Sequence, residues 1–142
     1  MIVLDTNVLS ALMRRSADHE VIDWLDRQPR KSVWTTSVTV LEARFGLAIL
    51  PAGKRRAQLT RAFDTVLLDK IEQRIAPFDS ASAQHAADLM ALRRRVGRPG
   101  DLRDSMQAGI VLAHHATLAT RNTRHFADLS VRVVNPWTDE LK

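Results

Sequence analysis

The stretch IVLDTNVLSALM, residues 2–13, contains the change from strand to helix on which the fold prediction depends. Residues 2–4 form a short apolar run that favours a β-strand. Residues 5–7, Asp-Thr-Asn, are of the types that favour helix N-termini, and residues 8–13 then place apolar side chains at helical spacing. A strand followed directly by a helix is how an α/β chain begins.

The same alternation continues along the chain. The patterns predict helices over 19–26, 39–50, 54–72, 80–95 and 104–115, and strands over 33–35, 75–76, 117–120 and 131–134. Alternating strands and helices favour a parallel sheet with right-handed crossovers and helices on both faces. Because 142 residues are typical of one domain and no repeat or linker divides them, we expect one α/β domain over residues 1–142.

Composition excludes some classes of function and favours others. The chain has no cysteine, so a disulfide, a thiolate zinc site and a thiol nucleophile are all excluded. No apolar run approaches the roughly 20 residues that span a bilayer, so we expect a cytoplasmic protein without a membrane segment. The net charge of +5, mostly from arginine, favours a polyanionic partner such as nucleic acid, although many basic proteins bind none.

Three acidic residues are predicted to meet at one edge of this sheet. Asp5 follows the first strand, Glu42 lies early in the helix after the second, and Asp104 opens the helix before the fourth. In such folds these positions share the carboxyl edge, where ligands bind near the switch in strand order. At an effective dielectric constant of about 20, two carboxylates about 4 Å apart repel each other by roughly 4 kcal/mol. A cluster of carboxylates therefore predicts a hard divalent cation, Mg²⁺ or Mn²⁺. Asn122 lies close after the fourth strand, so we expect it at the same edge of the sheet.

Asp5 and Glu42 also have explanations that involve no ligand. Asp5 could cap the first helix, and Glu42 stands three residues after Thr39, which is the spacing of a capping box. The helical neighbours of Glu42 at i−4, i+3 and i+7 are Val38, Phe45 and Ile49. An acid on an apolar stripe is costly unless it is paired or binds a metal, which favours a functional role for Glu42.

Asp101 and Asp104 compete for the third position. Asp104 follows Asp101 by three positions, which is the spacing between an N-cap residue and the amide that its side chain binds. We therefore expect one of the two to cap the helix and the other to be free. We predict Asp104 as the ligand and keep Asp101 as the rival. A role for His125 stays open.

Further side chains are candidates for supporting roles. Thr6 and Asn7 could orient Asp5 or a bound water, or merely cap the helix. Basic side chains near the predicted site are candidates for binding RNA phosphates, although each taken alone is better explained as an ordinary surface arginine. These candidates are Arg121, Arg124, Arg44 and Arg98.

With these residues in place, the sequence resembles the PIN-domain ribonucleases, specifically the VapC and FitB-like toxins of type II toxin–antitoxin systems. Blocks in the order and spacing of that family run along nearly the whole chain. They are VLDTNVL (3–9), SVTVLE (37–42) with FG (45–46), DSMQAGI (104–110), LATRNTRHF (118–126) and VNPW (134–137).

The resemblance implies a PIN-like parallel sheet of order 3-2-1-4-5, Mg²⁺- or Mn²⁺-dependent endoribonuclease activity, and inhibition by a cognate antitoxin protein; we also expect a homodimer. It places the family's central metal-site acids at Asp5, Glu42 and Asp104. Relatives often carry another acid after the fourth strand, where this chain has Asn122 and His125, so a second tightly bound metal is in doubt. The alternative functions are a noncatalytic nucleic-acid or protein-binding module and a DNA-directed nuclease of the same fold.

Overall fold

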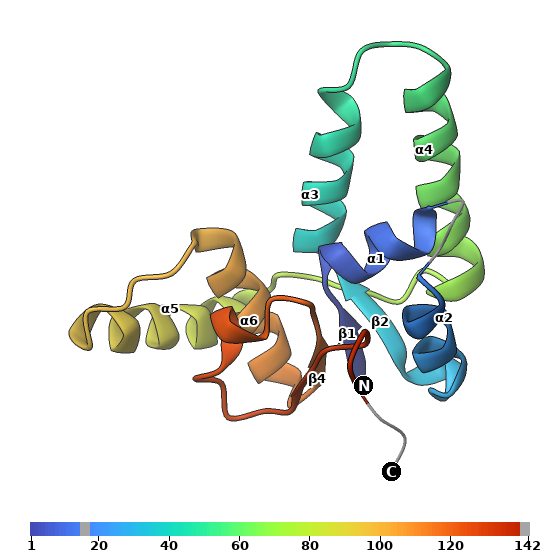
Figure 1. Ribbon diagram of the computed structural model, residues 1–142. Coiled ribbons are helices and arrows are strands. Elements are labelled where there is room, and N and C mark those ends of the chain that lie inside the picture. The colour runs from blue at the N-terminus through green and yellow to red at the C-terminus, as the bar shows by residue number, and fades with distance from the viewer. Residues whose placement is uncertain (15–17, 140–142) are drawn as a thin grey trace.

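The computed structural model of the protein describes residues 1–14 and 18–139 (Figure 1). The strands are β1 (Ile2–Leu4), β2 (Val33–Thr36), β3 (Ile75–Ala76), β4 (Thr117–Ala119) and β5 (Val133–Val134). The α-helices are α1 (Thr6–Met13), α2 (His19–Asp26), α3 (Ser37–Ala48), α4 (Lys54–Thr65), α5 (Ser80–Arg95) and α6 (Leu102–His114). Short helical turns complete the chain: η1 (Arg30–Ser32), η2 (Val66–Lys70) and η3 (Thr123–Phe126).

The strands form one parallel sheet in the order β3-β2-β1-β4-β5. The central strand β1 pairs with β2 on one side and with β4 on the other, with Val3 beside both Trp34 and Leu118. The order predicted from the family resemblance is therefore confirmed. The direction of winding reverses beside β1, so the carboxyl ends of β1 and β4 border the crevice in which such folds bind ligands.

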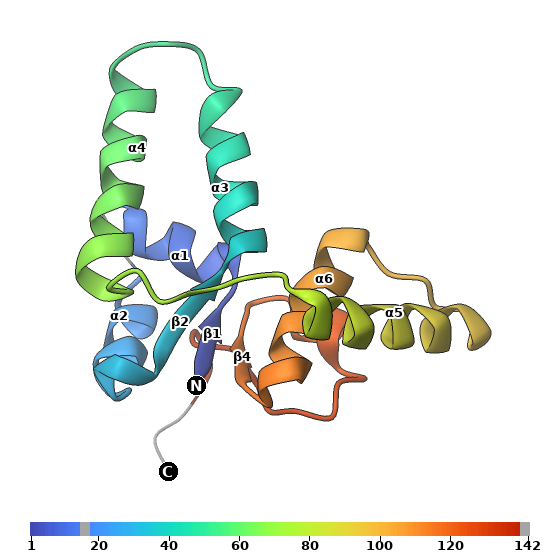
Figure 2. The same cartoon turned by 180° about the vertical axis from the view of Figure 1, so that it is seen from behind.

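Alternate side chains of β1 pack on opposite faces of the sheet. Leu4 belongs to the apolar cluster formed with α1, α2, α3 and α4, whereas Val3 belongs to the cluster formed with α5 and α6. Figure 2 shows these two groups of helices on either side of the strands. The prediction of helices on both faces is confirmed, and it follows from the two-residue period of a buried strand.

Helix α3 corrects two expectations about Glu42. The helix begins at Ser37 because the Thr36 side chain caps it, accepting from the Thr39 amide at 3.1 Å. The capping box of Thr39 with Glu42 is therefore wrong. The apolar stripe is also wrong as an argument for function, because Phe45 and Ile49 are 58% and 66% exposed and do not enclose the acid.

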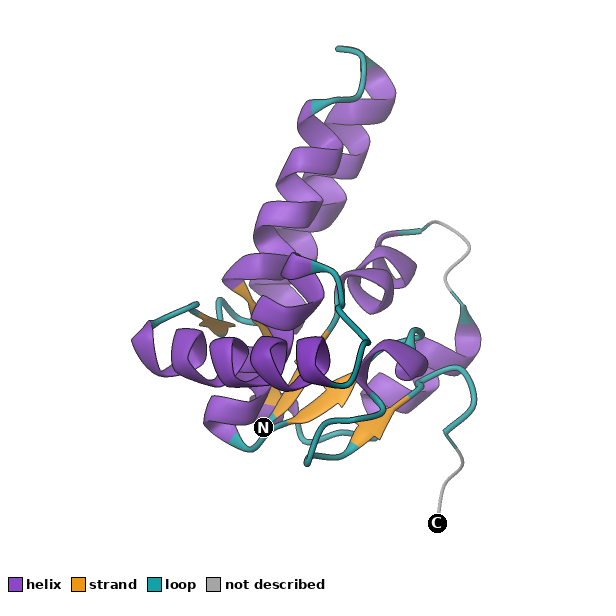
Figure 3. Cartoon of the chain, turned by 90° about the vertical axis from the view of Figure 1, so that its left-hand side faces the viewer, coloured by secondary structure: helices purple, strands orange, loops and turns teal. Residues whose placement is uncertain are grey.

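Other element boundaries shift for local reasons. The helix predicted over 54–72 is α-helical only to Thr65 and continues as the wider turn η2, with Ile71 N donating to Val66 O. Figure 3 shows α3 and α4 rising together from the sheet as a hairpin. None of the helices in the described part of the chain has the length and hydropathy that a bilayer crossing requires.

Helices α5 and α6 approach each other closely at Gly109. A Cβ atom at this position would press on the Ser82 carbonyl oxygen and lie 2.8 Å from the Ala86 Cβ. Only a residue without a side chain allows this approach. The contact matters for the site because α6 carries Asp104 in its first turn.

Candidate active site

Asp5 lies at the junction of β1, β4 and α1. Its backbone N–H extends the sheet by donating to Ala119 O at 2.9 Å, and its extended conformation ends β1 and begins α1. The residue is 7% exposed, so the carboxylate is largely removed from water. The topology therefore places an acid at the strand-order switch, as predicted.

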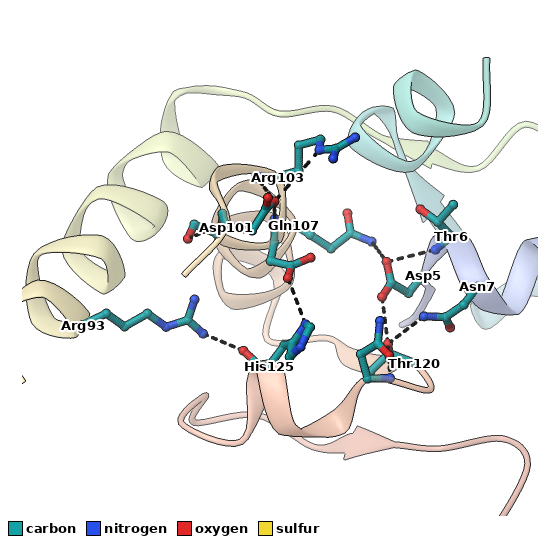
Figure 4. A network of polar contacts seen from close by, with 12 residues as sticks. Asp5, Thr6, Asn7, Arg93, Asp101, Arg103, Gln107, Thr120 and His125 are labelled. Atoms are coloured by element: carbon teal, nitrogen blue, oxygen red, sulfur yellow. Dashed lines mark hydrogen bonds and ion pairs between the residues drawn. The ribbon is translucent and has the colours of Figure 1, made fainter. Parts of the chain in front are cut away.

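The carboxylate of Asp5 is held by three donors, from α1, from α6 and from the loop that follows β4 (Figure 4). Its Oδ1 accepts from the Thr6 amide at 2.9 Å and from Gln107 Nε2 at 3.4 Å, and its Oδ2 accepts from Thr120 Oγ1 at 2.8 Å. Burial raises the pKa of Asp5, and the negative charge of Asp104 adds to the rise, while the bonds from Thr120 and Thr6 oppose it. The site thus contains an acid whose ionisation is costly without a cation.

Glu42 reaches the same region from α3, where its side chain is 26% exposed. Burial raises the pKa of Glu42 first, and the charge of Asp5 raises it further. Arg103 Nη1 lies 3.9 Å from Glu42 Oε2 and opposes the rise, as does a bond from Thr6. Asp5 is therefore close enough to Glu42 to disfavour the ionisation of Glu42.

Asp101 and Asp104 divide their roles at the start of α6. Asp101 Oδ1 accepts from the amides of Arg103 and Asp104 at 2.8 and 3.2 Å, so Asp101 is the cap. The prediction that one of the two caps the helix is confirmed. The Asp104 carboxylate is left to face His125, with 3.1 Å between Asp104 Oδ2 and His125 Nδ1.

A metal-binding group is not preformed here. In residues 1–14 and 18–139, no three His, Asp or Glu side chains are arranged to hold a metal ion. The reason is visible in the pairing: Asp104 faces His125, and Glu42 faces Arg103. Both pairs are partly exposed, and such pairs contribute only about 0–1 kcal/mol, so reorienting these side chains is cheap. Hard divalent cations prefer oxygen ligands, so the carboxylates of Asp5, Glu42 and Asp104 are of the right chemical type to bind one.

The predicted supporting residues act mainly through Thr120. Asn7 Nδ2 donates to Thr120 Oγ1 at 3.4 Å, and Asn7 Oδ1 accepts from the Arg121 amide at 3.0 Å. Asn122 contributes its backbone N–H, which donates to Thr120 Oγ1 at 3.1 Å, while the residue itself is exposed. Thr120 in turn donates to Asp5, so Asn7 and Asn122 hold the loop that positions the acid.

Gln107 is the main residue that sequence reasoning missed. It is 2% exposed; its Nε2 donates to Thr39 Oγ1 at 3.1 Å and reaches Asp5, and its Oε1 accepts from Thr36. This amide joins α6 to the end of β2, to α3 and to the junction between β1 and α1. The only signal in the sequence is a polar residue three positions after Asp104, directly before the apolar run 108–113.

The four arginines proposed for RNA have different surroundings. Arg44 Nη2 bonds Asp64 Oδ1 at 2.7 Å, and its guanidinium lies 4.7 Å from the centre of the Phe63 ring, so it is held against α4. The Arg121 guanidinium lies 4.2 Å from the centre of the Trp137 ring. The other two, Arg98 and Arg124, line a cavity together with Asp104 and His125.

Comparison with known proteins gives consistent results. The PIN domain family model matches residues 2–131. A VapC ribonuclease of Sinorhizobium fredii, Y4jK, is 38% identical over 137 residues, covering 96% of this chain and 98% of the relative. Toxin FitB of Neisseria gonorrhoeae is 34% identical over 139 residues, covering 98% and 100%.

A solved structure agrees in three dimensions. The crystal structure of FitAcB from Neisseria gonorrhoeae superposes with a TM-score of 0.87 at 34% identity, covering 97% of this chain and 99% of that one. Sequence and structure are thus similar over almost the full length of both proteins. The chain belongs to the PIN-domain family, in the group that includes the VapC and FitB toxins.

Proposed function

We propose that the protein is a divalent-metal-dependent endoribonuclease and the toxin of a toxin–antitoxin pair. The observation that carries the proposal is the gathering of acids at the strand-order switch of a basic domain: the buried Asp5 carboxylate feels the charge of Asp104, and Glu42 feels the charge of Asp5. A cation between them would relieve both the repulsion and the cost of burial. The name of the relative Y4jK, a VapC ribonuclease, supports RNA as the substrate.

Each residue of the site has a distinct task in this proposal. Asp5, Glu42 and Asp104 would hold Mg²⁺ or Mn²⁺, which when bound supplies Lewis acidity toward a phosphodiester and makes water more acidic. Thr120 and Gln107 fix the Asp5 carboxylate, so it need not reorganise when an ion arrives. Arginine side chains beside Asp104 would neutralise the phosphates of the bound RNA.

The proposed protein partners are a cognate antitoxin and a second copy of this chain, with which it would form a homodimer. Solved structures similar to this chain include FitAB bound to a DNA fragment and VapBC-5 of Mycobacterium tuberculosis, a member of the VapBC family of toxin–antitoxin systems. Helix α3 offers an uncovered apolar face for association, since Leu41, Phe45 and Ile49 follow one another at every fourth position and are 57%, 58% and 66% exposed. Apolar patches of this kind are typical of protein interfaces.

The test is cleavage of an RNA pool in Mg²⁺ or Mn²⁺, followed by mapping of the new ends. Wild type should cleave, and Asp104→Asn should lose at least ten-fold in rate. Asp101→Asn is the matched control, because it neutralises a carboxylate that caps α6 and should retain most of the activity. Metal-dependent cleavage at the wild-type rate by Asp104→Asn would remove this residue from the mechanism.

A noncatalytic binding module is the second candidate. It is favoured by the absence, among the described residues, of a preformed group of three metal-binding side chains. Calorimetric titration with Mn²⁺ separates the two. A binding module predicts no heat of binding and no cleavage, whereas the nuclease predicts binding that Asp5→Asn weakens.

A further inference from the structure

A cavity of about 830 Å³ lies beside the acids, outside the polar network around Asp5. Its walls are the end of α5, the loop that leads into α6, and η3 with the residues that follow it. Asp104 and His125 line this cavity, so a molecule bound there would extend to the proposed reacting phosphate. Binding sites for small ligands typically measure about 300–1,000 Å³, a range that accommodates one nucleotide.

Two positive side chains of the cavity have no ion-pair partner among the described residues. Arg93 and Asp128 neutralise each other through two bonds of 2.8 Å, and Asp101 is occupied as the cap of α6. In the described part of the chain, neither Arg98 nor Arg124 takes part in an ion pair. Two free guanidinium groups beside the acids suit a phosphate, which arginine binds through paired N–H groups.

Another part of the lining is apolar and open to solvent. Leu92 and Val96 line it and are 49% and 61% exposed, and Pro99 lies in the same wall. A peptide with acidic side chains would satisfy the arginines, but a nucleotide suits both parts of the lining, because it joins a phosphate to a base whose flat faces pack on apolar side chains. We propose that this cavity binds the nucleotide next to the scissile phosphate, with its base against Leu92 and Val96 and its phosphate on Arg98 and Arg124.

The floor of the cavity is built to keep this shape. Arg93 is 5% exposed, and besides Asp128 it donates to the His125 carbonyl at 2.9 Å, which ties α5 to η3. Gly100 lies over the same guanidinium, since a Cβ there would stand 2.9 Å from Arg93 Nη1. A single buried cation thus connects all three walls. The subsite rests on the proposed nuclease function, because the neighbouring phosphate is the one to be cleaved.

Binding is tested first, without cleavage. The probe is a fluorescein-labelled single-stranded oligoribonucleotide of random sequence, measured by anisotropy in EDTA over a range of salt concentrations. Arg98→Ala should weaken the affinity several-fold and reduce the slope of log K against log salt by about 0.7, the value for one lost phosphate contact to a single strand. The matched control is Arg95→Ala, an exposed arginine at the end of α5 that lies outside the cavity. Equal affinities and slopes for the two variants would overturn the proposal.

Specificity is tested second, with cleavage. Leu92→Gln and Val96→Gln should change the base preference at one position beside the cut and raise KM more than they lower kcat. Met90→Gln is the control, since Met90 is an exposed apolar residue of α5 outside the cavity. An unchanged preference in both wall variants would refute the subsite while wild type still cleaves. Absence of cleavage by wild type would instead refute the nuclease, and the binding experiment would still decide the cavity.

Discussion

The same substitution should have opposite effects at two helical glycines. Gly46 lies inside α3 with open space around the position of its missing Cβ, whereas a Cβ on Gly109 would collide with backbone of α5. Alanine is favoured over glycine within a helix by about 1 kcal/mol, so Gly46→Ala should stabilise the fold by up to that amount. At Gly109 the same gain is set against overpacking, which costs about 1–3 kcal/mol.

The magnitude at Gly109 should lie toward the upper end of that range. The obstacle is the Ser82 carbonyl and the Ala86 backbone nitrogen, 3.0 Å from the added carbon, and backbone within a helix cannot move independently. We therefore expect a net loss of about 1–2 kcal/mol. For a domain of this size that lowers Tm by about 3–8 °C, while Gly46→Ala raises it by about 2–5 °C.

The assay is thermal and urea unfolding of wild type and both variants, with RNA cleavage as a second readout. Because α6 carries Asp104 and Gln107 just before Gly109, displacement of α6 should also slow cleavage in Gly109→Ala but not in Gly46→Ala. If Gly109→Ala were as stable as wild type, the close approach of α5 and α6 would not be a constraint. A shift of the same sign in both variants would refute the reasoning.

Three further predictions concern charge. Burial and Asp5 raise the pKa of Glu42 in the folded state, so protonation of Glu42 stabilises the fold. This contribution to the free energy of unfolding is fully present below pH 4.5, the pKa of Glu42 in the unfolded chain, and is lost as the pH rises through the folded-state pKa. Glu42→Gln should therefore raise Tm at pH 7 in EDTA but not at pH 3.5, as scanning fluorimetry would show. Mg²⁺ at about 100 times its Kd should stabilise wild type by about 2.7 kcal/mol in urea unfolding, and Asp5→Asn by clearly less. Arg93→Met should cost about 1–2 kcal/mol at pH 7, because it removes hydrogen bonds to the His125 carbonyl and to Asp128, whose side chain is 45% exposed and screened by solvent. Since Arg93 lowers the pKa of Asp128, that stability is present above the unfolded value of 3.8, and the difference from wild type should shrink as pH falls through the folded pKa.

Much of the architecture was predictable because it depends on neighbours in the chain. Periodicity of apolar residues placed each strand and helix within a few positions, and a strand that is buried on both faces implies helices on both sides. The position of Asp5 after β1 and the capping relation of Asp101 to Asp104 are local in the same sense. The apolar stripe around Glu42 failed as an argument for function because periodicity shows which helix face is apolar, not whether another element covers it.

The sequence by itself therefore determined the alternation of strands and helices, and with it the acids at the carboxyl edge of the sheet. Only the tertiary structure decided their partners: Gln107 with Asp5, Arg103 with Glu42, and His125 with Asp104. It also decided that Arg93 joins α5 to η3. The physical reason is that hydrogen bonds and ion pairs act over about 3–4 Å. Residues far apart in the chain come within that distance only after the whole core has packed.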